Sequence, residues 1–424
     1  MTTEAGLGAP ARPDGTVHAD DVLAEVLKVD LADPRLYATD RPERIWRTMR
    51  GAGLPLRMPG PREHWAVTRY RQVRDVLGQS HLLSSERGMR LGEKASDGQA
   101  GEAAGGMSML VTDDPAHGEM RKALESAFTP RQMRRLAGGT EALARRLVVE
   151  AAAQPSVDFV ASVATPLLTT VACDLLGVPE SDRPHVASLT STAFSGSGHA
   201  TASATAQIGA HTQLLEYCAE LIASKRRAPG DDVASLLAQA RMNGRPMPTH
   251  IAVMNCHDFI LGGNASARFI LTSIPVTLVR HRPFWTELRT GRADFDVATE
   301  ELLRFEAPVN HLMRTLTGDV EVEGVRMRAG ELVTLWLRSA NRDADIFDDP
   351  DTMRATGRRH AHLTFGHGPH YCIAAYLARL EIRSLIRALA EEVADAELSA
   401  PPRRMESNFL RGYRAVPVAL RPRA

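Results

Sequence analysis

The chain has 424 residues, 51 basic against 51 acidic side chains and a hydrophobic content of 44%. This composition supports a sizeable core, and the length is compatible with two or three domains or with one large fold. Zero net charge gives no reason to expect nucleic acid as a partner, and four scattered cysteines without a Cys-x-x-Cys pair argue against a disulfide framework or a zinc site.

The N-terminal segment is rich in Gly, Ala and Pro and has no long apolar run. We therefore expect residues 1–19 to be disordered and to form neither a signal peptide nor a membrane anchor. Together with the cysteine pattern, this predicts a cytoplasmic protein. The first regular elements that we predict are helix Asp20–Val29, strand Glu63–Thr68 and helix Tyr70–Leu77.

A long aperiodic stretch from Gly88 to Gly106 precedes the polar motif Asp113-Asp-Pro-Ala-His117-Gly-Glu-Met-Arg121. Pro115 suits the first turn of a helix capped by Asp114, which would place His117 and Arg121 on one helical face. Taken alone, these side chains are also compatible with an ordinary solvated face. Thr129 and Pro130 predict the start of the next helix.

The middle of the chain is predicted to be helical at Leu167–Leu176, Leu214–Arg227 and Met247–Val279, with an irregular connection at Ser195–Ala210. Pro275 is expected to kink the longest of these helices near its end. Polar and charged side chains argue against a membrane span there, namely Asn255, His257, Asp258, Asn264 and Arg268.

Gly262 and Gly263 lie inside this long helix, where each glycine costs about 1 kcal/mol relative to Ala. A buried helix that carries this cost twice usually needs free space beside it. At about 100° per residue, Ser266 lies close in azimuth to Phe259 and Asn255. The alternative is a plain pair of glycines for helix packing.

Glu301 and Arg304 are three residues apart near the end of a shorter helix that Pro308 follows, so they can form an ion pair. Leu312–Thr334 alternates apolar and polar residues around a turn at Glu323-Gly324, which predicts a small β-sheet. An irregular segment is expected after Asn341.

A glycine-rich loop carries Phe365, Gly366 and Gly368 and leads to Cys372. Apolar residues then recur with helical spacing at Ile373, Tyr376, Leu377 and Leu380. Cys372 is thus predicted at a helix N-terminus, where the helix dipole and free N–H groups lower the pKa of a thiol. A buried structural cysteine after a turn is the alternative interpretation.

The pattern Phe365-Gly-x-Gly-x-His370-x-Cys372 resembles the haem-binding loop of the cytochrome P-450 family, in its soluble bacterial form. The family usually has Gly where this chain has Ala374. The resemblance covers roughly residues 20–420. It implies a mainly α fold with a small β-sheet region, a single domain over residues 20–424, and haem between the long central helix and the Cys loop.

The resemblance also implies roles for individual residues. Cys372 would be the iron ligand, held in the loop with Phe365, and Glu301–Arg304 would anchor the fold behind the haem. Arg358 stands next to the position at which the family has a third member of that network. The propionates of haem b need cationic or N–H partners, and the candidates are His117, Arg121, Arg314 and His370. The turn at Ser407–Gly412 would approach the haem.

Gly262-Gly263-Asn264-Ala265-Ser266 resembles the family's oxygen-binding helix segment, normally small-Gly-x-acid-Thr. Gly263, Asn264 and Ser266 are therefore the catalytic candidates on this side. Ala265 replaces the acid and Ser266 the threonine. Proton delivery would fall to Asn264, Ser266, water or the substrate.

No flavin or iron–sulfur motif is present in this sequence, so the resemblance implies electrons from a ferredoxin and its reductase. A basic patch for an acidic ferredoxin, or else ordinary solvated arginines, would comprise Arg121, Lys122, Arg131, Arg134, Arg135, Arg358 and Arg359.

Three functions remain open at this point. The first is a monooxygenase that uses O2 to hydroxylate or epoxidise a small, specialised-metabolite substrate. The second is an oxidase variant that couples bonds or closes a ring without inserting oxygen, which the Ala265/Ser266 pair favours; nitric oxide reductase is a weaker option. The third is a haem-containing binding domain without turnover.

Overall fold

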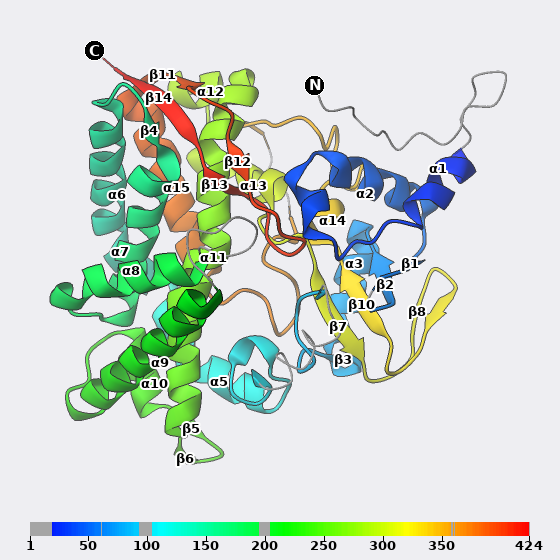
Figure 1. Ribbon diagram of the computed structural model, residues 1–424, viewed down its shortest axis with the longest axis horizontal. Coiled ribbons are helices and arrows are strands. Elements are labelled where there is room, and N and C mark those ends of the chain that lie inside the picture. The colour runs from blue at the N-terminus through cyan, green and yellow to red at the C-terminus, as the bar shows by residue number, and fades with distance from the viewer. Residues whose placement is uncertain are drawn as a thin grey trace.

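The computed structural model describes residues 19–60, 62–92, 104–194, 204–357, 359 and 361–423. Figure 1 shows a helical part on one side and a part with the larger sheet and the first helices on the other. The segment that leads into α15 (Ala375–Glu392) runs between the two parts. The predicted mainly α fold with a small β-sheet region is confirmed.

Helix α11 (Thr249–Arg280) is the longest described helix and crosses the helical part. Its flank is covered by α7 (Thr165–Leu176), and α6 (Pro130–Ala152) packs along α15. The largest described hydrophobic cluster joins these helices, because Leu167, Ile270 and Leu385 are all fully buried in it. Apolar residues at helical spacing therefore hold α11 between its neighbours.

Caps in the sequence determine where several helices begin. Thr129 accepts a hydrogen bond from the backbone N–H of Gln132, as predicted for the start of α6. Asp294 caps α13 (Phe295–Glu306). The remaining α-helices in the described ranges are α1 Ala19–Val26, α2 Arg41–Ala52, α3 Tyr70–Gly78, α5 Ala116–Leu124, α8 Arg183–Phe194, α9 Ala204–Arg227, α10 Val233–Gln239, α12 Arg282–Arg289 and α14 Leu337–Ala340.

The main sheet has five strands in the order β1-β2-β10-β7-β3. Strand β10 runs parallel to β2 and antiparallel to β7, with Val333 opposite both Trp65 and Arg314. This register places Arg314 on β7, an interior strand of the sheet whose residues are all buried. The strands are β1 Leu56–Met58, β2 His64–Val67, β3 Leu83–Ser84, β7 Leu312–Leu316 and β10 Leu332–Leu335.

Smaller sheets complete the fold. A three-stranded sheet joins β11 (Val393–Leu398), β14 (Pro417–Pro422) and β4 (Val157–Asp158). The predicted turn at Glu323-Gly324 connects β8 to β9, and both of its residues have positive φ. The two-stranded pairs are β5 Arg241–Met242 with β6 Arg245–Pro246, β8 Val320–Val322 with β9 Val325–Met327, and β12 Arg403–Arg404 with β13 Tyr413–Ala415.

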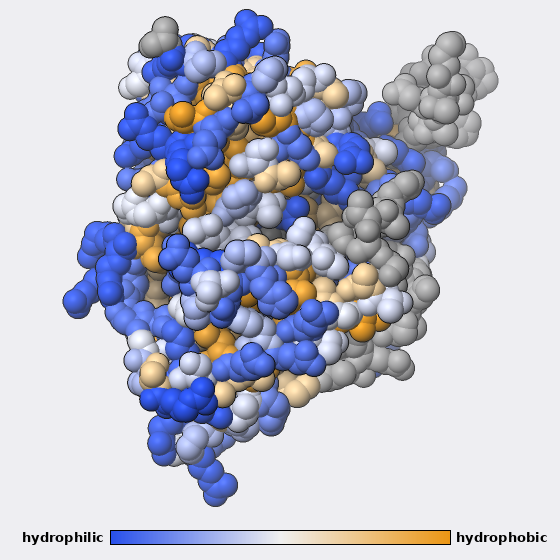
Figure 2. All heavy atoms as spheres, turned by 60° about the vertical axis from the view of Figure 1, so that its left-hand side comes forward, coloured by the Kyte–Doolittle hydropathy of each residue, from blue (hydrophilic) through white to orange (hydrophobic). Residues whose placement is uncertain are grey.

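Helix α11 is long and apolar enough to cross a membrane, but 60% of its most apolar window is buried inside the protein. Figure 2 shows hydrophobic atoms as separate patches among hydrophilic ones on the face that it presents, and not as a continuous belt. The burial of α11 is that of a core helix, as its polar residues indicated.

Several predicted boundaries are wrong by a few residues. Helix α1 ends at Val26 and not at Val29, and α5 begins at Ala116, with Pro115 just before its first residue. The predicted connection Ser195–Ala210 is in part the first turns of α9, because Ala204 already begins that helix. Predicted disorder at the N-terminus, most of the loop 88–106 and residues 195–203 lie outside the described residues.

Candidate active site

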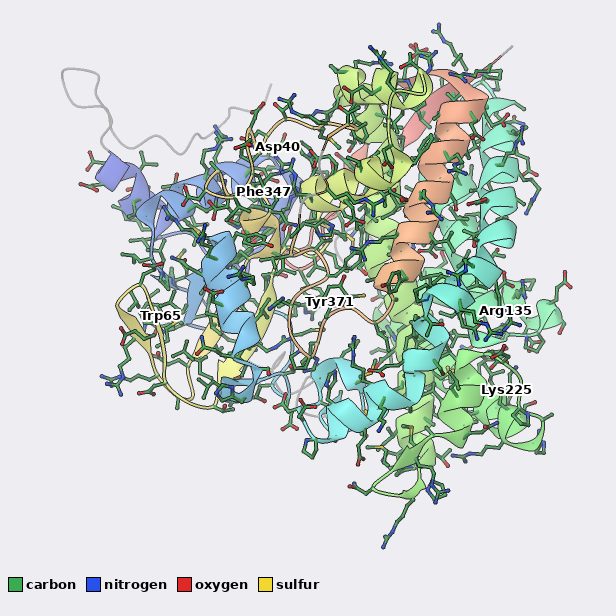
Figure 3. The ribbon with its side chains drawn as sticks, turned by 180° about the vertical axis from the view of Figure 1, so that it is seen from behind. Asp40, Trp65, Arg135, Lys225, Phe347 and Tyr371 are labelled. Atoms are coloured by element: carbon green, nitrogen blue, oxygen red, sulfur yellow. The ribbon has the colours of Figure 1, made fainter. Side chains whose placement is uncertain are left out.

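One cavity of about 320 Å³ lies between α11 and the segment that carries Cys372. It is lined by Cys372 on one wall and by Ser266 on α11, with Arg314 and His370 among the polar groups and Phe409 and Leu410 near the C-terminus. Tyr371, next to Cys372, lies between the helical part and the sheet part in Figure 3. The predicted approach of the Ser407–Gly412 turn to the site agrees with this lining.

Tight backbone hydrogen bonds hold the Cys372 loop. The N–H of Cys372 donates to the carbonyl of Phe365 at 2.9 Å, and that of Gly366 donates to Leu363 at 2.8 Å. Gly366 and Gly368 have φ of 74° and 77°, which favours glycine. A Cβ at Gly368 would lie 2.8 Å from the carbonyl oxygen of Leu77, so a larger residue does not fit there.

Ala374 stands where the resembled family usually has glycine, and the backbone accommodates it. Its φ is −87° and its ψ is 15°, an ordinary region for any residue. Helix α15 begins directly after it, at Ala375. Leu377 and Leu380 are buried, whereas Tyr376 is 52% exposed, so the predicted apolar face of this helix is wrong at Tyr376.

The thiol of Cys372 does not have the lowered pKa that its helix N-terminus predicts. Burial raises the pKa of Cys372, and this effect outweighs the backbone N–H of Ala374 and the positive charges of Arg121 and Arg379, which lower it. The effect of the helix N-terminus is too weak to lower this pKa by itself, because the surrounding walls exclude water from the sulfur. A positive charge beside the sulfur, such as a metal ion, would favour the thiolate at this position.

Two arginines on the cavity wall, Arg121 and Arg314, form what we call its cationic end. Arg314 is 3% exposed, and the contact of its guanidinium is the carbonyl oxygen of Met313 at 2.8 Å. Burial lowers the pKa of Arg314 to about 10 despite the charge of Asp113. Within the described part of the chain, no carboxylate forms an ion pair with Arg314.

Two histidines lie beside this cationic end, and His117 Nδ1 is 3.4 Å from a carboxylate oxygen of Asp114. The rings of His117 and His370 stack with centroids 4.0 Å apart, and His370 Nε2 lies 3.4 Å from the hydroxyl of Ser85. Burial lowers the pKa of His370 to about 3, with a further contribution from the charge of Arg314. Arg121, one turn after His117 on α5, lines the same cavity. The structure thus brings together all four residues that the sequence assigned to anionic groups.

A network with balanced charge supports the loop from behind. Arg304 donates two hydrogen bonds to Glu301, at 2.8 and 2.7 Å, and others to the carbonyls of Asn341 and Pro350. Asn341 in turn contacts Leu363 and Thr364 at 2.8 Å. The predicted Glu301–Arg304 pair is confirmed, while Arg358 lies outside the described residues.

On the opposite wall, α11 places Gly262 and Ser266 against the cavity. A Cβ at Gly262 would have no atom within 4 Å, so the free space predicted beside the glycine pair exists at this position. Gly263, Asn264 and Ala265 continue the helix, and the positions of their side chains lie outside the described part.

Two carboxyl groups on the cavity wall were not predicted from the sequence. Asp258 lies one turn before Gly262 on α11, at the spacing that puts it on the same face. Glu381 follows Cys372 by nine residues on α15, and burial raises its pKa well above the ordinary value. The periodicity of α11 contained the signal for Asp258, but we interpreted its charge there only as evidence against a membrane span.

These residues fit a haem group. A porphyrin carries two carboxylates that would compensate Arg314 and its neighbours, and the Cys372 sulfur is the soft ligand that an iron ion takes. The buried guanidinium without a carboxylate partner is the observation that carries this fit.

Comparisons with known proteins agree with the fold and the site. A sequence model described as Cytochrome P450 matches residues 295–394. Cytochrome P450 NovI of Streptomyces niveus is 30% identical over 94% of this chain and 97% of its own length, and linalool 8-monooxygenase of Pseudomonas putida is 30% identical over 93% and 99%. The crystal structure of P450 OxyD superimposes with a TM-score of 0.85 at 32% identity, covering 93% of this chain and all of that one.

Proposed function

The chain belongs to the cytochrome P450 family, and on that basis we propose that it is a monooxygenase of a small, specialised-metabolite substrate. Its relatives are P450 oxidoreductases with a haem-thiolate iron cofactor, and we assign haem b here. OxyD is involved in the biosynthesis of vancomycin-type antibiotics, which supports this class of substrate. We assign residues 20–424 to one domain and the protein to the cytoplasm.

Cys372 is the proposed iron ligand. The observation that carries the assignment is its place on the cavity wall in a loop fixed by backbone hydrogen bonds, opposite Ser266 on α11. When bound, the haem supplies O2 activation, which a thiolate ligand favours by donating electron density. The Ala374 N–H next to the sulfur would moderate that donation.

The propionates are proposed to lie at the cationic end. Arg314, Arg121, His117 and His370 would hold them, and Phe365 would pack in the Cys loop. Arg379 lies over the ring of Phe365 at 4.6 Å and binds Glu300 at 2.6 Å, so this side of the loop is fixed as well. These residues would orient the group before substrate enters. Haem binding would also neutralise the positive charges of Arg121 and Arg314, and the histidines would act as N–H donors.

Ser266 is the proposed hydroxyl that would hold and pass a proton at its Oγ on the cavity wall, with Gly263 and Asn264 beside it on α11. The usual acid is absent because Ala265 takes its place. Ser266 can both donate and accept a hydrogen bond, so it can hold an ordered water molecule or a polar group of the substrate at this position.

Electrons are proposed to come from a ferredoxin and its reductase. A surface groove of about 550 Å³ lies beside the Cys loop, with Tyr371 and Tyr376 on its wall. Four arginines line it against two carboxylates, namely Arg134, Arg359, Arg379 and Arg383 against Asp296 and Glu300. This excess of positive charge suits an acidic donor protein. Two members of the predicted patch lie elsewhere, since Arg121 lines the cavity and Arg135 pairs with Asp231.

The experiment for the ligand is the spectrum of the reduced CO complex. We expect the red-shifted band of a thiolate-bound haem in the native protein and its complete loss, with loss of activity, in Cys372→Ser. Cys218→Ser, at another buried cysteine, is the matched control and should keep the band. A Cys372→Ser protein that retains the band would falsify the assignment.

A second candidate is oxidative coupling or ring formation without oxygen insertion, which the Ala265 and Ser266 residues on α11 favour. Turnover under ¹⁸O2 with mass analysis of the product separates the two. Incorporated label supports the monooxygenase, and a product that has lost hydrogen without gaining label supports coupling.

A further inference from the structure

Asp258 places a carboxylate on the same stripe of α11 as Gly262 and Ser266. The three residues are spaced by four, and all of them line the cavity. At about 1.5 Å per residue, Asp258 and Ser266 are about 12 Å apart along the helix axis. Asp258 is therefore well removed from the position proposed for oxygen, at a distance that an elongated small molecule can span.

The carboxylate is held in place by a neighbouring segment. Ser108 donates a hydrogen bond to Asp258 Oδ2 at 2.5 Å. Asn255, one turn earlier, accepts from the N–H of Met109 at 3.0 Å and donates to the carbonyl of Met107 at 2.8 Å. Helix α11 and residues 107–109 thus form one wall, and Asp258 has a fixed position in it.

The charge of Asp258 has no strong partner in the described part of the chain. His257 Nδ1 is 3.7 Å from Oδ1, too far for a hydrogen bond, and that nitrogen has no hydrogen-bond partner among the described residues. No lysine or arginine of the described ranges forms an ion pair with Asp258. Its side chain is 20% exposed, in a lining that is otherwise mostly apolar, such as Met109, Leu175 and Phe259.

We propose that Asp258 binds a positively charged amine group of the substrate and so determines which carbon faces Ser266. A carboxylate beside apolar walls costs free energy unless a cation or donors compensate it, and one oxygen of Asp258 remains available. The inference rests on the proposed function, because it deepens that function by naming the substrate class. Asp258 is a specificity-determining residue, and the substrate carries its cation about two helical turns from the oxidised atom.

The alternative role is purely structural, in which Asp258 only fastens Ser108 to α11. Asp258→Asn separates the two, because the amide oxygen can still accept from Ser108 while the charge is lost. Ser108→Ala is the matched control, since it removes that hydrogen bond and keeps the charge. Asp258→Lys reverses the charge at the same position.

The probe is phenylbutyl trimethylammonium, whose nitrogen has no lone pair and cannot ligate iron. Its neutral counterpart carries a tert-butyl group in place of trimethylammonium, and phenylpentanoate supplies the opposite charge. Binding of each to the haem-loaded protein is measured by equilibrium dialysis, and the haem absorption spectrum is recorded in parallel.

We expect the native protein to prefer the ammonium probe, and Asp258→Asn to lose about tenfold or more of that preference, as for a lost interaction with a charged group. Ser108→Ala should keep the preference, and Asp258→Lys should shift it to phenylpentanoate. Equal binding of the ammonium and neutral probes by the native protein overturns the proposal, as does an unchanged preference in Asp258→Asn. Either result leaves the proposed function intact if the thiolate-haem spectrum is present; its absence from the native protein refutes the proposed function separately.

Discussion

Arg304 and Arg314 are both buried arginines of the same site, but the charges around them differ. Arg304 faces Glu301 and three backbone carbonyls, so its donors are satisfied within the chain. Arg314 has the carbonyl of Met313 and no carboxylate in ion-pair contact among the described residues. The charges around Arg304 are balanced within the chain and support the Cys372 loop, whereas Arg314 lacks an anion in ion-pair contact.

This difference separates the two kinds of buried charge. A buried ion that is paired within the chain contributes to the stability of the fold. A buried ion that faces a cavity without an ion-pair partner is instead balanced by a ligand. The comparison predicts that variants at Arg304 will affect folding and that variants at Arg314 will affect haem retention. Substitutions at Arg304 and at Arg314 test this difference.

The largest effect on folding is expected at the balanced pair. Arg304→Ala leaves Glu301 buried without its partner, so the free energy of unfolding should fall by about 3–5 kcal/mol. Urea unfolding followed by circular dichroism measures it. The matched control is Arg146→Ala, which breaks an exposed pair with Glu150 and should cost about 1 kcal/mol or less. Equal losses in the two variants would contradict the contrast.

Arg314→Ala should instead weaken haem binding, by about 1–3 kcal/mol, because a propionate loses a charged donor. Transfer of haem to excess apomyoglobin, followed by absorption, measures the loss. The stability of the haem-free protein should not fall, since the variant removes a guanidinium that lacks a counter-ion there. Arg314→Lys keeps the charge and should retain haem better than Arg314→Ala. Unchanged haem transfer in Arg314→Ala would reject its role.

The pH dependence of stability should differ between the haem-free and haem-loaded forms. Burial and the charge of Arg314 lower the pKa of His370 to about 3, below its ordinary value of 6.5. Protonation therefore favours the unfolded chain, and the haem-free protein should lose stability as pH falls from about 6.5 towards 3. A propionate beside His370 would raise its pKa and flatten this loss.

Urea unfolding between pH 7 and 4 measures both slopes. His311, whose pKa burial also lowers to about 3, contributes in both forms because it lies in the core. His370→Gln should therefore reduce the difference between the forms and leave the contribution of His311. Identical slopes in the two native forms would mean that no anion approaches His370.

The parts of the site that could be predicted are those that neighbouring residues encode. The Cys372 loop needs glycines and a cysteine within eight residues, and Glu301 pairs with Arg304 three residues away, so both are visible in the sequence. The helices and the small sheet follow from periodicity in the same way. The raised pKa of Cys372 was missed, because it depends on walls contributed by distant segments.

The role of Asp258 was missed for a related reason. Its hydrogen bond to Ser108 joins residues 150 positions apart, and no local pattern indicates that contact. That no carboxylate among the described residues forms an ion pair with Arg314 likewise becomes visible only after the chain is folded. Sequence patterns therefore predict the helices, strands and local ion pairs better than they predict the charge balance of the cavity.

Ser266→Ala tests an uncharged polar group of the cavity, on the wall formed by α11, in contrast to the two buried arginines. This variant should leave folding and haem retention unchanged, because Ser266 is a small residue beside open space at Gly262. Its expected effect is on coupling, since removing the hydroxyl removes one donor and acceptor from the proposed path of protons.

Product formed per NAD(P)H consumed, with peroxide assayed in parallel, measures this coupling. We expect less product and more peroxide in Ser266→Ala by a few-fold, below the factor of about 10²–10⁴ typical of a dedicated general acid, because water can substitute in part. Ser266→Thr is the matched control, because it keeps the hydroxyl and restrains it by β-branching, so coupling should be equal or better. Full coupling in Ser266→Ala would show that protons reach oxygen without this hydroxyl, and the substrate or water would then be the donor that replaces the acid missing at Ala265.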